Sequence, residues 1–372
     1  MDESRDFIEW VGQDMSVNIL NCLEDPSDLV RASAVSRSWR HFVISNGLSK
    51  GMCLRMFPET SMFTRVIEVK NMFKPVVAEV DDSSESARLQ REHRAFSYLI
   101  RCLTVFSEEN CISNALFASS TDNYPEESVK NTLQPSDRLD NRASYWSSKG
   151  AANPAAPETL LYRLASQLCL ITEVHVHPFQ AYFQIGFPIY SAKAVRFRMG
   201  HAKVNLDIES EVGIGFLDVQ DFSDDKFVWT YCSPEFPMAQ DNSLQKFKLP
   251  EPILCIGGIL KVELLGRVQT QEMDGLYYIC INHVQVVGRP LYPVFDVEMI
   301  NEKGHCALKY TPESTFNLSS PAQLLEAGPS SWSHLQRFSE SIRTWEQMIL
   351  NTFRGAGPLM IDDYDSDYEL LD

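Results

Sequence analysis

Apolar residues recur at helical spacing through the first fifty positions of the chain. Before a turn at Asp25-Pro26, such positions are occupied by Met15, Ile19, Cys22 and Leu23. Asp25 can cap a second helix with its carboxylate, and Pro26 suits the first helical position, where a missing amide hydrogen costs nothing. A third helix, ending near Gly47, is predicted by a further apolar stripe at Val35, Trp39, Phe42 and Val43. We therefore expect a compact three-helix unit over residues 14–47.

The pattern is mixed between residues 51 and 84 and then becomes helical again. One face of a helix at about residues 86–106 is lined by Leu89, Phe96, Leu99, Ile100, Leu103 and Phe106. We interpret residues 51–109 as a linker whose helix packs two modules together.

From about residue 110, short β-type runs alternate with Gly, Pro, Asn and Asp. The runs that best fit strands are 169–177, 194–199, 204–208, 226–232, 259–265 and 277–287. No unit of about 20 to 50 residues repeats, which disfavours propellers and solenoids. The spacing instead predicts an antiparallel β-sandwich or jelly roll over residues 110–312. We expect Gly257 and Gly258 to form a tight turn or a bulge.

The carboxyl-terminal part carries one more helical stripe and an acidic end. Within residues 313–354, one helix face would hold Phe338, Ile342, Trp345 and Ile349. Such a stripe packs most often against the same protein and less often into a partner's groove. Residues 355–372 contain acidic residues and no basic ones, so we expect a disordered, solvated tail.

Composition favours a globular protein that remains inside the cell. Of the 372 residues, 44% are apolar, and no apolar run approaches the roughly 18 to 20 residues that span a membrane. The amino terminus lacks the features of a secretory signal, so we expect cytoplasmic and/or nuclear localisation. Nine cysteines without a CxxC pair predict reduced, mostly buried thiols. A net charge of −17 would repel a phosphate backbone, which argues against nucleic acid as a partner.

The stretch from Gln13 to Val43 resembles the F-box. The family pattern contains Ile-Leu, then Leu, a Pro-containing turn, Asp-Leu, and Ala-Ser-x-Val-Ser-x-x-Trp-Arg. The matching residues are Ile19, Leu20, Leu23, Pro26, Asp28, Leu29, Ala32, Ser33, Val35, Ser36, Trp39 and Arg40. In this family the helices dock on the Skp-type adaptor of a Skp-cullin-F-box ubiquitin ligase. A unit of this size buries little apolar area alone, and an exposed apolar stripe needs a partner.

Residues 110–288 resemble the discoidin type of galactose-binding-like sandwich. The opening strands are similar at Ala118-Ser119-Ser120, Leu139-Asp140, Tyr145-Trp146-Ser147-Ser148 and Glu158-Thr159-Leu160. The closing strands are similar at Leu264-Leu265-Gly266-Arg267 and at residues 284–288. Sugar binding does not follow from such a fold resemblance.

An F-box followed by this sandwich resembles a plant F-box protein. The resemblance implies a multidomain α+β chain: an F-box over residues 1–50, a connecting helix, an antiparallel sandwich, a carboxyl-terminal helix and an acidic tail. It also implies a non-catalytic substrate receptor. The F-box would bind a Skp-type adaptor and, through it, a cullin, while the sandwich would bind an unknown protein substrate. Two alternatives stay open: a carbohydrate- or metal-binding sandwich without a ligase role, and a cupin-like metalloenzyme.

The candidate site residues follow from these resemblances. The adaptor-binding surface and its supporting core are assigned to Ile19, Leu20, Leu23, Pro26, Leu29, Val35 and Trp39. Ligand contacts of a sandwich come from loops at one end, for which the aromatic candidates are Trp146, Trp229, Tyr231 and Phe236. Each of these four could equally fill the core of the sandwich.

Evidence for metal binding or catalysis is sparse. Glu173, His175 and His177 alternate on one strand face, and two imidazoles at this spacing could share a metal. A cupin would place a glutamate about four residues later, where this chain has Gln180 and Ala181, so we favour an ordinary solvent-facing strand. There is no GxSxG or P-loop spacing. We expect no catalytic residue, no metal and no cofactor.

Overall fold

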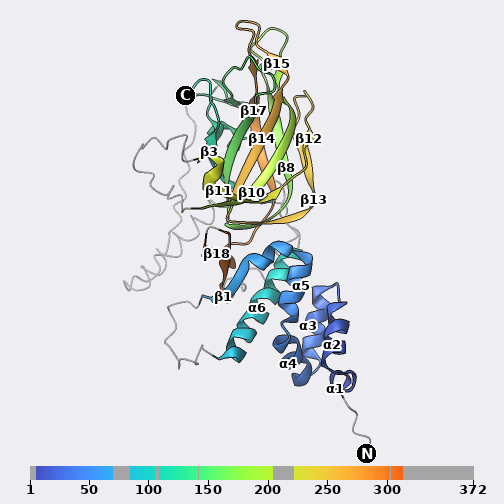
Figure 1. The fold of residues 1–372 in the computed structure, drawn as a ribbon. Coiled ribbons are helices and arrows are strands. Elements are labelled where there is room, and N and C mark those ends of the chain that lie inside the picture. The colour runs from blue at the N-terminus through green and yellow to red at the C-terminus, as the bar shows by residue number, and fades with distance from the viewer. Residues whose placement is uncertain are drawn as a thin grey trace, which may run out of the picture. The chain divides into compact units, whose positions relative to one another are not determined.

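The amino-terminal helices of the computed structural model follow the capping signals in the sequence. The structure describes residues 6–69, 84–104, 109–140, 142–203, 222–301 and 303–312. A short helix, α1 (Phe7–Val11), precedes α2 (Gln13–Asn21), α3 (Pro26–Ala34) and α4 (Arg37–Ser45) (Figure 1). The Asp25 carboxylate accepts the amide hydrogen of Ser27 at 2.7 Å and caps α3. Ser36 Oγ accepts the amide hydrogen of Trp39 at 3.1 Å and caps α4 in the same way.

Val35 lies between two helices. The apolar stripe assigned it to the third helix together with Trp39, but it is the C-cap residue of α3, and α4 begins only after Ser36. That assignment was wrong because the spacing of four residues between Val35 and Trp39 is the same across a cap as within one helix. Val35 is consequently exposed at the corner between α3 and α4.

A fifth helix and a strand follow where the sequence pattern is mixed. Helix α5 (Leu48–Met56) begins after Gly47, whose φ of 59° lies in the left-handed region that favours glycine. A 3-10 helix, η1 (Pro58–Met62), leads to strand β1 (Phe63–Glu68). Helix α6 (Glu85–Thr104) is the predicted connecting helix.

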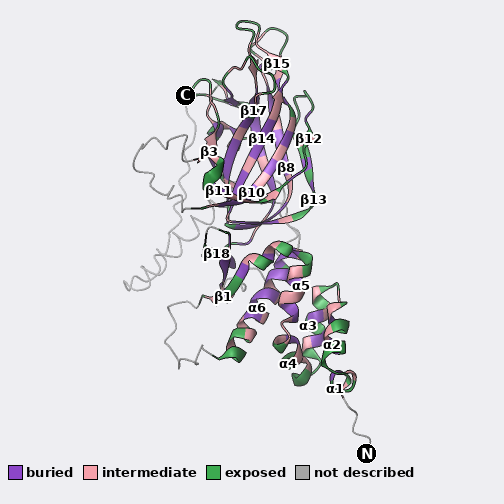
Figure 2. Ribbon diagram, in the orientation of Figure 1, coloured by how far each residue is buried: buried purple, intermediate pink, exposed green. Residues whose placement is uncertain are grey.

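Helix α6 lies at the centre of one hydrophobic core. Four of the six residues of its predicted apolar face, Phe96, Leu99, Ile100 and Leu103, are buried (Figure 2). Leu89 is half-buried, and Phe106 lies outside the described residues. The same core contains residues of the earlier helices, namely Leu20, Leu29, Ala32, Val43, Leu48, Met52 and Cys53. Helices α2 to α6 therefore share one packed core, to which the helix within the predicted linker contributes.

Most of the remaining described chain forms a β-sandwich of two antiparallel sheets (Figure 1). The strands of the first sheet are, in order, β11 (Phe227–Cys232), β10 (Ala192–Ala202), β14 (Ile259–Arg267), β7 (Glu158–Leu164) and β3 (Ile112–Ala118), with β12 (Phe236–Pro237) paired to β10. The strands of the second are β13 (Gln245–Ile256), β8 (Leu168–Gln180), β17 (Cys280–Pro290) and β2 (Glu109–Asn110), with β6 (Trp146–Ser147) on β17 and β9 (Ile189–Tyr190) on β8. The predicted antiparallel sandwich is confirmed.

The two sheets enclose a second hydrophobic core. Alternate residues of facing strands fill it, among them Leu160, Tyr162, Val174, Val176, Phe197, Val262, Val284 and Val286. Gly257 and Gly258 form the predicted tight turn between β13 and β14, with φ of 99° and 68°. A Cβ at Gly257 would lie 2.1 Å from Cβ of His201, so a larger residue does not fit there.

A small third sheet links the helical unit to the end of the described chain. Strand β1 pairs in parallel with β19 (Cys306–Tyr310), and β19 pairs antiparallel with β18 (Phe295–Met299). Shorter elements are the hairpins β4 (Arg138–Leu139)–β5 (Arg142–Ala143) and β15 (Gln269–Thr270)–β16 (Tyr277–Tyr278), and the 3-10 helices η2 (Val129–Leu133) and η4 (Asp224–Lys226).

Several expectations fall on residues outside the described ranges. These are the strand at 204–208, the helix after Pro329 and the acidic tail at 355–372. All nine cysteines are described; they are free, and seven of them are buried, as predicted. Among the described helices, none is both long and apolar enough to cross a membrane.

Candidate functional site

Large apolar side chains are exposed in unusual number on the first helices. Between residues 7 and 35, the exposed ones are Phe7, Trp10, Met15, Ile19, Val30 and Val35. We call these six residues the helical apolar set. A single exposed apolar side chain is ordinary, but a concentration of them within one small unit indicates a surface that a partner covers.

The structure divides the seven predicted adaptor-binding residues into surface and support. Ile19 and Val35 belong to the helical apolar set and are 41% and 64% exposed. Leu23, Pro26 and Trp39 are half-buried. Leu20 and Leu29 are buried in the core around α6, so neither is available for contact with a partner.

Trp39 holds the first short helix against α4. Its indole Nε1 donates to the Asp6 carboxylate at 2.7 Å, and its ring stacks on Phe7 with centroids 6.2 Å apart. Asp6 also caps α1 by accepting the amide hydrogen of Ile8. Trp39 therefore positions Phe7, one member of the helical apolar set.

The four aromatic residues proposed for ligand binding do not form a common site. Trp146 is fully buried in the sandwich core, and its Nε1 donates to the Ser120 carbonyl at 3.0 Å. Trp229 lies on β11 between Arg198 and Lys261, whose charged groups lie 5.5 and 5.7 Å from its ring centroid. The remaining two, Tyr231 and Phe236, pack against the sandwich core. Strands, not loops, carry all four.

The Glu173, His175 and His177 face is not an open, solvent-facing strand. His175 is buried, and its Nε2 donates to the Glu173 carboxylate at 2.9 Å. His177 Nε2 donates to Asn242 Oδ1 at 3.0 Å, and His177 Nδ1 accepts from Asn282 at 3.2 Å. Both histidines thus have protein partners. In the part of the chain that the structure describes, no group of three His, Cys, Asp or Glu side chains could hold a metal ion.

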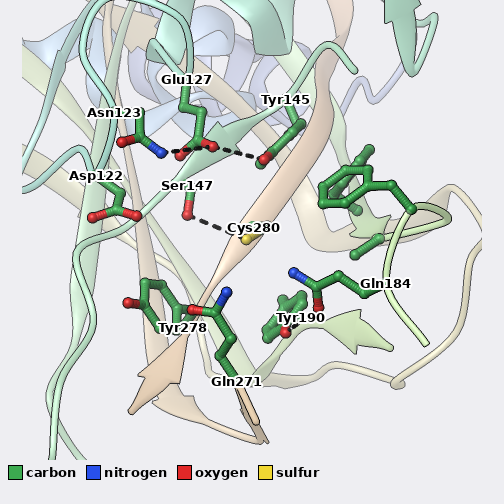
Figure 3. Close-up of a pocket in the computed structure, with 13 residues that line it drawn as sticks. Asp122, Asn123, Glu127, Tyr145, Ser147, Gln184, Tyr190, Gln271, Tyr278 and Cys280 are labelled. Atoms are coloured by element: carbon green, nitrogen blue, oxygen red, sulfur yellow. Dashed lines mark hydrogen bonds between the residues drawn. The ribbon is translucent and has the colours of Figure 1, made fainter. Parts of the chain in front are cut away.

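A cavity of about 220 Å³ lies at one end of the sandwich, among loops and short strands that the sequence places far apart (Figure 3). We call it the end cavity. Its lining residues are Asp122, Asn123, Glu127, Tyr145, Ser147, Phe179, Ala181, Phe183, Gln184, Tyr190, Gln271, Tyr278 and Cys280. They come from the β3–η2, β8–β9 and β15–β16 connections, from β6, β8, β9, β16 and β17, and from the residue before β6. Loops at the end of a rigid sandwich are where recognition is expected.

Aromatic rings form much of the wall of the end cavity. Tyr145 stacks on Phe179 with centroids 3.9 Å apart, and Phe183 lies within 6.4 Å of Tyr145. On the opposite side Tyr190 meets Tyr278 edge to face at 6.3 Å. The hydroxyl groups of these last two residues donate to Gln184 and Asp274, which fixes their rings.

Carboxylates form the other distinctive part of the wall. Glu127 Oε1 accepts from Tyr145 Oη at 2.7 Å and from Asn123 Nδ2 at 3.2 Å, as Figure 3 shows. Glu127 Oε2 is buried without a hydrogen-bond partner among the described residues. Desolvation raises the pKa of Asp122, and the negative charges of Glu127 and Asp274 raise it further.

The end cavity does not contain a reactive nucleophile. Burial raises the pKa of Cys280 to about 12, so its thiol is neutral at physiological pH. That thiol lies 3.4 Å from Ser147 Oγ and no histidine lines the cavity in the described structure. The arrangement is suited to binding rather than to covalent chemistry.

A buried ion pair holds the segments around the end cavity. Arg267 pairs with Glu158 and also donates to Ser148 Oγ and to the carbonyls of Lys149, Ala156 and Tyr277, at 2.8 to 3.1 Å. Glu158 in turn accepts from the hydroxyls of Ser119 and Ser120. Arg267, Glu158, Ser148, Ser119 and Ser120 come from the motifs on which the discoidin resemblance was based.

Sequence reasoning did not identify the end cavity. The available signal was the concentration of aromatic and amide side chains in Phe179, Gln180, Tyr182, Phe183 and Gln184. From the sequence, Gln180 and Ala181 were discussed only as positions at which a cupin would have a glutamate. The cavity could not be assembled from sequence because its lining residues come from separate segments between residues 122 and 280.

Solved structures similar to the sandwich share little sequence with it. Discoidin II from Dictyostelium discoideum is 12% identical, with a TM-score of 0.33, over 52% of this chain and 64% of its own. A fucolectin from the striped bass, Morone saxatilis, is 10% identical, with a TM-score of 0.32, over 52% and 50%. The family 32 carbohydrate-binding module of Streptococcus pneumoniae EndoD is 10% identical, with a TM-score of 0.31, over 48% and 98%. The sandwich assignment itself rests on the strand pairing.

The helical unit and the whole chain both match known sequences. The family model described as F-box-like matches residues 13–55, which span α2 to α5. An F-box protein of Arabidopsis thaliana is 46% identical over 368 residues, covering 96% of this chain and 95% of its own length. With a match of that identity along almost the entire sequence, this chain belongs to the F-box protein family.

Proposed function

We propose that this protein is the substrate-recognition subunit of a Skp-cullin-F-box ubiquitin ligase. The observation that carries the proposal is the helical apolar set, which lies in and beside the segment that the F-box-like family matches. The helices bind a Skp-type adaptor and, through it, a cullin. The protein has no catalytic role of its own and acts in the cytoplasm and/or the nucleus.

The sandwich binds the target protein through the end cavity and its rim. Tethering the target beside the ubiquitin-charged enzyme raises the effective concentration of target lysines there, and this proximity is the source of the rate gain. Helix α6 and the sandwich residues Leu168, Leu170 and Leu254 belong to the same hydrophobic core. The distance between the adaptor-binding helices and the end cavity is therefore fixed.

Co-purification with a Skp-type adaptor tests the proposal. The variant Ile19→Glu with Val35→Glu places two carboxylates on the helical apolar set, at side chains whose exposure lets the fold tolerate the change. An unpaired carboxylate in an apolar interface costs several kcal/mol, so we expect adaptor affinity to fall by more than about a hundredfold. The matched control is Val268→Glu with Ile300→Glu, at exposed apolar residues outside the helices.

Three results are informative. Stoichiometric binding by the intact chain and the control, together with loss in the folded Ile19/Val35 variant, supports the receptor function. Unchanged binding by that variant would mean that the helical apolar set is not the adaptor surface. Absence of binding by the intact chain would exclude the receptor function.

Carbohydrate binding by the sandwich is the second candidate function. The observation in its favour is the end cavity, where aromatic rings lie beside carboxylate and amide groups that could accept hydrogen bonds from hydroxyls. Titration of the chain with galactose, fucose and chitin oligosaccharides tests it, with Tyr278→Ala as the variant that should abolish binding. A metal-dependent role has no support in the described residues, which contain no group of three ligands.

A further inference from the structure

The end cavity is negatively charged. Asp122 and Glu127 line it, and no basic side chain is among the described residues that do. Arg267 is buried and pairs with Glu158, so its charge is already balanced. The charge of Lys149 acts on Asp122, but more weakly than the negative charges of Glu127 and Asp274. The cavity therefore presents net negative charge to whatever enters it.

The titration behaviour of the surrounding groups agrees with that charge. After desolvation, the largest causes that raise the pKa of Tyr145 are its hydrogen bond to Glu127 and the charge of Glu127. The pKa of Tyr278 is raised in the same way by burial and by Asp274, with a smaller effect of Asp122. For both tyrosines burial is the largest cause, and the neighbouring carboxylates raise the pKa further, as expected in a negative field.

Aromatic faces beside carboxylates favour a cation. The ring quadrupole attracts an ammonium or guanidinium group placed within about 6 Å of the ring centroid, and the attraction grows when the site is desolvated. Tyr145, Phe179 and Phe183 supply such rings on one side, and Tyr190 and Tyr278 supply them on the other. An anion would be repelled by Asp122 and Glu127, and an uncharged ligand would leave their charges unbalanced.

Large, exposed apolar side chains lie close in sequence to residues that line the end cavity. Ile185 is 93% exposed and lies next to the lining residues Phe183 and Gln184. Met273 is 92% exposed and lies in the β15–β16 turn, two residues from the lining residue Gln271. Phe187 is also exposed in the β8–β9 connection. Exposed apolar side chains of this size in the segments that line a polar cavity suit a polypeptide segment with apolar residues on both sides of its anchor.

We propose that the end cavity receives a lysine or arginine side chain from an extended segment of the target protein, with apolar residues flanking it. The proposal rests on the proposed function, since it gives the chemistry by which the receptor recognises its target. The cationic group lies between the two aromatic sides near Asp122 and Glu127. The flanking apolar residues contact Ile185, Phe187 and Met273.

Peptide binding to the full chain, co-purified with a Skp-type adaptor, tests the proposal. The probes are pentapeptides with lysine, arginine, norleucine or glutamate at the centre and every combination of Leu, Ile, Val and Phe at the flanking positions. We expect the best lysine or arginine peptides to bind at least about tenfold more tightly than their norleucine counterparts, about 1.4 kcal/mol. Glutamate peptides should not bind, and the preference should weaken at high salt.

Matched variants test whether Asp122 and Glu127 cause the preference for lysine and arginine peptides. Asp122→Asn with Glu127→Gln removes both charges, while glutamine at 127 keeps an oxygen that can accept from Tyr145 and Asn123. We expect this variant to lose the preference for lysine and arginine over norleucine. The control, Glu109→Gln with Glu298→Gln, removes two exposed charges that do not line the cavity and should keep the preference.

The inference and the proposed function fail in different ways. Equal binding of lysine and norleucine peptides, binding of no peptide, or a cation preference that survives Asp122→Asn with Glu127→Gln would each overturn the inference. A sugar that binds the cavity in place of the peptides would do the same. If the adaptor still co-purifies in these experiments, the receptor function stands; if it does not, that function fails whatever the peptides show.

Discussion

At the scale of single residues, Arg267 is the side chain that most constrains the end cavity. Its guanidinium is buried and donates to four residues in three segments of the chain as well as to Glu158. Ser148 and Tyr277, two of its acceptors, lie next to the lining residues Ser147 and Tyr278. A fork of five donors in fixed geometry can satisfy all these partners, which lysine could not do.

Replacement of Arg267 by methionine should destabilise the fold strongly. The change leaves the Glu158 carboxylate buried without its cation, and breaking a buried pair in this way costs roughly 3 to 5 kcal/mol. Urea unfolding measures the loss, with exposed Arg142→Met as the control, which should change stability by less than about 0.5 kcal/mol.

A second variant identifies the cause of that loss. Adding Glu158→Gln to Arg267→Met removes the uncompensated charge and should restore part of the stability. If the double variant is no more stable than Arg267→Met alone, the buried charge does not cause the loss of stability. The cause is then the loss of the hydrogen bonds from Arg267 to the loops.

Buried histidines give the fold a dependence on mildly acidic pH. Burial lowers the pKa of His283 below its usual value of 6.5, with smaller effects of His177 and His175, and its Nδ1 donates to the Thr132 carbonyl at 2.8 Å. Desolvation also lowers the pKa of His93, with contributions from Arg40 and Arg94. The native state therefore resists protonation at both positions, whereas the unfolded chain accepts protons below about pH 6.5.

The free energy of unfolding should accordingly fall as the pH decreases from 7 towards 5.5. Above pH 6.5 the histidines are neutral in both states, so their contribution to stability is complete; it is lost as the pH falls through the unfolded value. We expect His283→Gln to show a smaller decrease than the parent, measured by urea unfolding at a series of pH values. Exposed His41→Gln is the control, and an identical decrease in His283→Gln and the parent would contradict the prediction.

At the scale of elements, the sequence predicts those whose ends carry local signals. Asp25 and Pro26 define the start of α3 because capping depends on the side chain at the boundary itself, whereas the Ser36 cap that starts α4 was not recognised in the sequence. The strands β8, β10, β11, β14 and β17 were located by their β-type runs between turn residues. These signals are contained within a few neighbouring residues.

Elements that depend on distant partners were not predictable in this way. Helix α5 buries Leu48, Ser49, Met52 and Cys53, but its short sequence has little helical periodicity, and its burial depends on α6. Strand β1 is stabilised by a parallel partner more than 200 residues away, between Phe63 and Cys306. The end cavity depends in the same way on segments that only the sandwich brings together. Local pattern carries no information about such pairings.

At the scale of the whole molecule, the helical unit and the base of the sandwich share one hydrophobic core. The cluster around α6 contains Leu168, Leu170, Leu254 and Leu291 of the sandwich strands and the residues after them. Arg289 of β17 also donates to the carbonyl of Cys102 in α6 at 3.0 Å. The helices and the sandwich should therefore lose structure together, because neither can unfold without exposing apolar surface of the other.

Leu103→Ala tests this cooperativity. Leu103 is buried in the shared core, and removing three carbon atoms there should cost roughly 2 to 5 kcal/mol and leave a cavity. Hydrogen exchange followed by mass spectrometry should show reduced protection in α6 and in β8 and β17 to the same extent, because one global opening exposes all three. Exposed Leu139→Ala is the matched control and should leave the protection of all three elements unchanged. Loss of protection confined to α6 would instead mean that the helical unit opens by itself, and the fixed distance between adaptor surface and end cavity would then have no structural basis.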